Sequence, residues 1–137
     1  RPPRSTQGVS SAASDVYKRQ DGVFEGGLIC PGMLISAEAL YSRAAQLFQV
    51  NLDKPEQLIG KNTTESMQSG IFNGYCAMIE ALVVKITEDL RKRNQPKPKV
   101  IITGGHATKI SEYLPDAAIE ENLTLTGLSL IHLLNQK

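Results

Sequence analysis

Apolar side chains recur at helical spacing over residues 63–93, and this stretch makes the strongest structural prediction in the chain. Positions three or four apart place their side chains along one stripe of a helix. Asn62 is suited to cap such a helix, and Glu65, three residues on, completes a capping box. We therefore predict one long helix over residues 62–93. Its apolar stripe consists of Met67, Ile71, Tyr75, Met78, Ile79, Leu82, Val83, Ile86 and Leu90.

Shorter patterns on both sides of this helix predict alternating strands and helices. Residues 23–30 predict a strand that is interrupted by Gly26-Gly27. Ser36 is a favourable N-cap for a helix over residues 36–48. Residues 99–103 are β-branched and almost wholly apolar, as expected of a covered central strand. The remaining expected elements are a short helix to residue 113, a weak strand at residues 117–120 and a final helix from about residue 124, which together make an α/β pattern.

The first twenty residues carry neither a helical nor a strand pattern. Residues 10–20 match one translated frame of a common transposase-type sequencing adaptor, and residues 1–6 match the flow-cell end of that adaptor. We therefore expect residues 1–20 to be a non-native, disordered tail and exclude them from fold reasoning. The native domain is expected to span residues 21–137. A natural disordered tail is the alternative.

Composition limits the classes of partner. The 137-residue chain has a net charge of +1. Residues 1–20 contribute +3, which leaves about −2 for residues 21–137, so we expect no nucleic-acid partner. We expect no membrane partner either, because no apolar run of spanning length is evident. Two cysteines and two histidines without ligand spacing argue against a metal site and for reduced thiols in the cytoplasm.

Two glycine motifs are candidate ligand sites. Gly26 and Gly27 lie in the strand predicted near the N-terminus, and Thr103, Gly104 and Gly105 follow the strand predicted at residues 99–103. Glycine lets the backbone approach a ligand closely, and a helix start offers free N–H groups to anions. Each motif taken alone is more often a simple turn.

The run from Gly60 to Gly70, Gly-Lys-Asn-Thr-Thr-Glu-Ser-Met-Gln-Ser-Gly, resembles the substrate-side helix entry of the type III pantothenate kinases. The two glycine motifs flank this run at positions that agree with the order of motifs in that family. The resemblance covers residues 21–135. It implies the ribonuclease-H-like half of an actin-like ATPase (ASKHA) kinase fold, truncated at its N-terminus. It implies that Thr63 contacts pantothenate and that the glycine motifs hold nucleotide. The alternative for Thr63 is that it only caps the helix.

The resemblance also implies an activity for the intact protein: ATP-dependent phosphorylation of pantothenate to 4'-phosphopantothenate, the first step of coenzyme A biosynthesis. It implies ATP with a divalent cation, potassium or ammonium as a monovalent cation, and a homodimer. The family's Asp-x-Gly-Asn motif, its base aspartate and its Asp-x-Gly-Thr-Ala segment do not occur in this chain. We therefore assign no catalytic residue and expect the chain by itself to be inactive. Small departures from the family occur at Phe48, Asn73 and His106.

Two other functions remain open. A non-catalytic relative of the same fold could act as a regulatory or transcription-accessory protein. A fragment of a sugar or acetate kinase is the third hypothesis, although those families lack the sequence seen here at residues 61–70. A parent gene that encodes the base aspartate would favour the pantothenate kinase.

Overall fold

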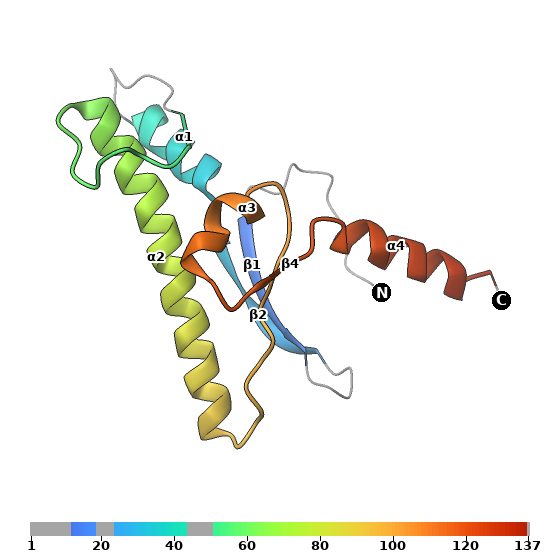
Figure 1. Ribbon diagram of the computed structural model, residues 1–137. Coiled ribbons are helices and arrows are strands. Elements are labelled where there is room, and N and C mark those ends of the chain that lie inside the picture. Colours follow the sequence, from blue (N-terminus) through green and yellow to red (C-terminus); the bar gives the residue numbers. More distant parts are fainter. Residues whose placement is uncertain (1–11, 19–23, 44–50, 137) are drawn as a thin grey trace. The chain divides into compact units, whose positions relative to one another are not determined.

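The structure, a computed structural model, describes residues 12–18, 24–43 and 51–136 (Figure 1). The chain divides into two compact units, Arg1–Tyr75 and Cys76–Lys137, which are described separately. Helices and strands alternate along the described residues, and one small sheet is parallel. The expected mixed α/β class is therefore confirmed.

An antiparallel hairpin opens the first unit. Strand β1, Ala12–Lys18, pairs with strand β2, Phe24–Pro31. Tyr17 lies opposite Gly26, whereas the next residue of β1 lies opposite the first residue of β2, so Glu25 is one extra residue. Gly26 has a φ of 120°. This value falls in a region that glycine adopts readily, and glycine is common at such bulges.

The strand at residues 12–18 differs from the disordered tail that the sequence predicted. Pairing in a sheet uses backbone N–H and C=O groups, so a segment with weak strand propensity can still pair with an available partner. The rest of the expected tail, residues 1–11 and 19–20, lies outside the described residues. The adaptor origin of the segment stays a prediction.

Helix α1, Met33–Arg43, begins three residues before the predicted start. The N–H of Ser36 donates to the carbonyl of Gly32 at 3.0 Å, so Ser36 lies within the first turn and the predicted N-cap is wrong. Met33 and Ala37 lie one turn apart and are each 1% exposed. Their joint burial favours the earlier start. Residues 44–48 of the predicted helix lie outside the described residues.

Helix α2, Thr63–Lys92, confirms the prediction of one long helix. Its 30 residues correspond to about 45 Å in length.

By length and composition alone α2 could also cross a membrane, although no apolar run of spanning length was predicted from the sequence. Core helices of soluble proteins can have the same length and composition, so these properties do not identify α2 as membrane-spanning. The residues of α2 that are buried are Ser69, Ile71, Phe72, Cys76, Ile79 and Leu90.

The second unit contains a parallel pair of short strands, β3 (Ile101–Ile102) and β4 (Ala118–Ile119). Ile102 is 7% exposed but Ile101 is 44% exposed, so β3 is covered on one side only and is not the covered central strand that was predicted. The predicted helices are present. They are α3 (Ala107–Ile110), which continues into the 3-10 turn η1 (Ser111–Tyr113), and α4 (Leu123–Leu134).

Candidate functional site

The start of α2 carries the predicted capping box. The side-chain Oδ1 of Asn62 accepts a hydrogen bond from the N–H of Glu65 at 2.9 Å. One carboxylate oxygen of Glu65 accepts from Asn62 Nδ2 at 2.8 Å, and the other accepts from the N–H of Lys61 at 2.8 Å. In a standard box the return bond goes to the N-cap N–H; here it goes to the residue before it. Both ends of the box are therefore satisfied without Thr63.

Thr63 is the first residue of α2, and its side chain is exposed. Asn62, not Thr63, caps the helix, so the alternative in which Thr63 only caps is wrong. Among the described residues, none makes a hydrogen bond to the Thr63 hydroxyl. A threonine hydroxyl can donate one hydrogen bond and accept others, so this group is available to a ligand.

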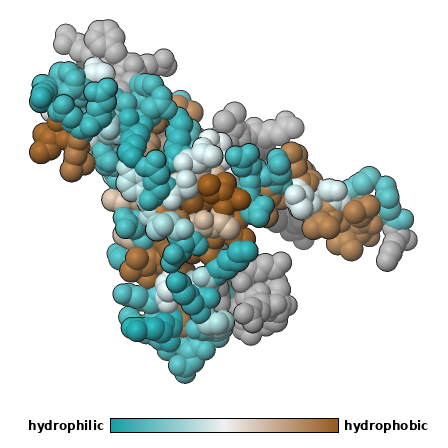
Figure 2. All heavy atoms as spheres, viewed as in Figure 1, coloured by the Kyte–Doolittle hydropathy of each residue, from teal (hydrophilic) through white to brown (hydrophobic). Residues whose placement is uncertain are grey.

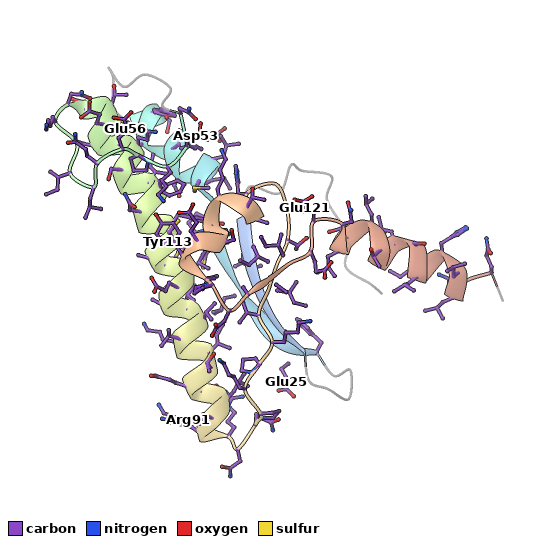
Figure 3. The ribbon with its side chains drawn as sticks, in the orientation of Figure 1. Glu25, Asp53, Glu56, Arg91, Tyr113 and Glu121 are labelled. Atoms are coloured by element: carbon purple, nitrogen blue, oxygen red, sulfur yellow. The ribbon has the colours of Figure 1, made fainter. Side chains whose placement is uncertain are left out.

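The loop before α2 is held against the helix by side chains of its first two turns. Ser66 Oγ donates to the carbonyl of Gly60 at 3.3 Å, and Gln68 Nε2 donates to the carbonyl of Asp53 at 3.1 Å. Ser69 Oγ donates to the carbonyl of Leu58 at 2.5 Å. The loop, which also carries Asp53 and Glu56 as labelled in Figure 3, is thus attached to the helix through its backbone.

Gly60 lies where no side chain would fit. A Cβ at this position would lie 2.5 Å from the carbonyl carbon of Glu65 and 2.7 Å from Ser66 Cα, and it would also meet the backbone nitrogen of Ser66. These are backbone atoms, which cannot move without disturbing the first turn of α2. Sequence reasoning included Gly60 in the family-like run but gave it no role. The only available sequence signal was a glycine placed just before a helix cap.

Two large apolar side chains of the same loop are exposed. Leu58 is 73% and Ile59 is 82% exposed. Figure 2 shows hydrophobic atoms at the outer edge of this loop, at the upper left of the view. Their side chains face solvent while the neighbouring carbonyls of Leu58 and Gly60 bond to α2.

The candidate nucleotide residues fall into different units. Gly26 and Gly27 lie in β2 within the first unit, whereas Thr103, Gly104 and Gly105 lie in the second unit. A Cβ at Gly26 would have no atom within 4 Å, so the backbone there is open to an approaching group.

The motif after β3 has the predicted strand–glycine–helix form. Gly104 has a φ of 93°, which favours glycine, and its carbonyl accepts from the N–H of Ala107 at 3.0 Å. Thr103, Gly105 and His106 are exposed. The helix that follows has 4 residues, so its contribution to binding an anion is small.

The described part of the chain contains no group of three or more His, Cys, Asp or Glu side chains that could hold a metal ion. Cys30 is half-buried and Cys76 is buried, and the structure joins neither of them in a disulfide. No residue of the structure is therefore assigned to a cation.

Comparison with protein families gives a match to the family described as type III pantothenate kinase, over residues 12–85. The matched segment is more than half of the 137-residue chain. It contains Gly26, Gly27 and Thr63 but ends before Thr103. It also begins inside the segment that was expected to be adaptor-derived.

Comparison with solved structures gives a conserved protein from Campylobacter jejuni that is assigned to the Baf family of transcriptional activators. The two chains share 20% sequence identity with a TM-score of 0.53, and the match covers 93% of this chain. This likeness shows a shared fold. The chain spans 60% of the length of that protein.

Proposed function

Because the chain belongs to the type III pantothenate kinase family, we propose that the intact protein transfers the γ-phosphoryl group of ATP to pantothenate, giving 4'-phosphopantothenate. The observation that carries this proposal is the exposed, unbonded hydroxyl of Thr63 at the start of α2, inside the matched segment. The resemblance to this family implied the same residue as the contact for pantothenate.

The physical setting of Thr63 supports a role in binding the substrate. Pantothenate carries a carboxylate, hydroxyl groups and an amide, all of which form hydrogen bonds with a hydroxyl. The N-terminus of a helix also favours negatively charged groups. With Asn62 occupying the cap and Glu65 turned back toward the loop, the Thr63 hydroxyl is free to meet the ligand.

For the nucleotide, we propose the glycine motifs at Gly26-Gly27 and Thr103–Gly105, in an actin-like ATPase fold. The open space around Gly26 and Gly104 would let phosphate or adenosine approach the backbone. A divalent cation with ATP, and potassium or ammonium, belong to the proposed activity of the intact enzyme. A cytoplasmic location belongs to the same proposal.

A homodimer is the proposed assembly, and α2 offers a surface for it. Gly70, Gly74, Ala77 and Ala81 follow at intervals of four, three and four residues, so they form one stripe, and all four are exposed. Of the 30 residues of α2, only six are buried, so much of the helix surface is open to a partner. Small residues allow two helix backbones to approach closely.

A second function is favoured by the structural neighbour. Its assignment to a family of transcriptional activators agrees with the non-catalytic, regulatory alternative. An assay of the intact protein with ATP, a magnesium salt, potassium and pantothenate distinguishes the two. Formation of phosphopantothenate supports the kinase, and its absence from a folded, full-length protein rejects it.

The Thr63 assignment is tested by titrating pantothenate into Thr63→Ala and Thr63→Ser variants with a calorimeter. We expect Thr63→Ala to weaken binding by about fivefold to thirtyfold, as loss of one to two kcal/mol implies. Thr63→Ser keeps the hydroxyl and should bind as the unmodified protein does. Equal affinity of the alanine variant would show that Thr63 does not contact pantothenate.

A further inference from the structure

We infer that Ser69 and Asn73 are positioning residues, which hold residues 58–62 against α2 and thereby set the position of Thr63 for pantothenate. The inference rests on the proposed function, because it concerns the orientation of the same substrate contact. Neither residue is assigned a role by the sequence pattern. Asn73 stands where the resembling family commonly has an aromatic residue.

Ser69 is a buried polar residue of α2, with 3% of its surface exposed. Its Oγ lies 2.5 Å from the carbonyl oxygen of Leu58 and 3.0 Å from Asn73 Nδ2. A serine hydroxyl has one hydrogen to donate. Because the amide of Asn73 donates to Ser69 Oγ, the hydroxyl hydrogen is directed to the Leu58 carbonyl.

Asn73 is held in the position that this arrangement needs. Its Nδ2 also donates to the backbone carbonyl of Ser69 at 3.1 Å, one helical turn earlier. The two bonds come from the same amide nitrogen and use both of its hydrogens. Asn73 therefore orients Ser69 without touching the loop directly.

The effect reaches Thr63 through a short, continuous set of contacts. Leu58 is bonded to Ser69, and Gly60 lies directly against the backbone of Glu65 and Ser66. The next residue, Lys61, donates its N–H to Glu65. Residues 58–62 are thus attached to residues 65–69 at successive points. Thr63 follows this segment directly. Loosening the Leu58 attachment therefore makes the segment that leads into Thr63 less well fixed, and with it the position of Thr63.

Three variants of the intact protein test the inference. Ser69→Ala removes the donor to Leu58. Asn73→Asp keeps the side-chain size but replaces the donating amide by an acceptor, which competes for the Ser69 hydrogen. Ser42→Ala is the matched control, because the Ser42 hydroxyl bonds to the Ala39 carbonyl within α1.

Two measurements are made on each variant: amide hydrogen exchange at Lys61 and Glu65, and calorimetric titration with pantothenate. For Ser69→Ala and Asn73→Asp we expect roughly threefold to tenfold faster exchange at both amides and a similar loss of pantothenate affinity. Ser42→Ala should match the unmodified protein in both. Exchange at residues 76–90 of α2 reports whether each variant remains folded.

The outcomes separate this inference from the function on which it rests. If the intact protein does not bind pantothenate, the substrate role of Thr63 fails, and the positioning role fails with it. If the intact protein binds but both variants bind equally well, the positioning role alone is overturned. Faster exchange with unchanged affinity also overturns it, because the loop attachment would then be structural only.

Discussion

At the scale of single residues, the surroundings of each glycine decide what it does. Gly60 lies against the backbone of Glu65 and Ser66, whereas Gly127 in α4 has no atom within 4 Å of an added Cβ. The same substitution should therefore have opposite effects at the two positions. Gly60 is required by close approach, and Gly127 is a helical residue with lower propensity than alanine.

We expect Gly60→Ala to lower the free energy of unfolding by about 2–4 kcal/mol, because the new methyl group overlaps backbone atoms that cannot shift cheaply. Gly127→Ala, the control, should raise helix stability by up to about 1 kcal/mol. Urea denaturation followed by circular dichroism measures both. A neutral Gly60→Ala would mean that the loop does not lie against α2 as described.

The cap of α2 allows a second prediction at this scale. Replacing Asn62 by alanine removes the acceptor for the Glu65 N–H and should cost about 1 kcal/mol of stability. Asn62→Ser keeps an acceptor for that N–H without placing a second carboxylate beside Glu65, and it is the control. Urea denaturation midpoints of the two variants are compared; equal midpoints would show that the side chain of Asn62 does not stabilise the helix.

At the scale of elements, α2 is the helix on which the proposals depend. Its first two turns hold the loop with Ser66, Gln68 and Ser69. A different part of its surface carries exposed small residues. Its length follows from the apolar periodicity, and its exposed small residues together with the exposed Val84 leave room for a partner helix.

We expect Gly74→Leu to prevent dimer formation, because a bulky side chain would keep a second α2 from approaching. Within one chain the change is tolerated sterically, since nothing lies within 4 Å of a Cβ at Gly74. Gly127→Leu in α4 is the matched control, with the same open surroundings. Molar mass from light scattering gives the result. A dimer that survives Gly74→Leu unchanged would place the interface elsewhere.

At the scale of the whole molecule, α4 is the described helix with the least coverage. None of its residues is buried, and hydrophobic atoms line the face seen in Figure 2. Large apolar surface without a partner promotes association. The exposed apolar residues of α4 are Leu123, Leu125, Leu128, Leu130, Ile131, Leu133 and Leu134, at 44–74% exposure.

The isolated 137-residue chain should therefore aggregate in proportion to its concentration. Replacing Leu125 and Leu134 by glutamate should raise the soluble fraction several-fold without loss of helix content, since neither side chain is buried. Leu90→Glu in α2 is the contrasting variant, because Leu90 is 5% exposed and a charge there should unfold the chain. Sedimentation and circular dichroism report both properties. Unchanged aggregation after the α4 substitutions would show that another surface is responsible.

The sequence by itself determined α2, its capping box and the position of Thr63 in the first turn of the helix. These features depend on contacts within a few residues, so periodicity and cap chemistry were enough to predict them. The same local rules correctly predicted α3, β4 and α4.

Only the tertiary structure decided the pairing of β1 with β2, the early start of α1 at Met33, the contact of Gly60 with α2 and the bonds of Ser69 to Leu58 and Asn73. Strand pairing, joint burial and loop attachment bring together groups that lie apart in the sequence. No local pattern of residue types specifies which partner each of them meets.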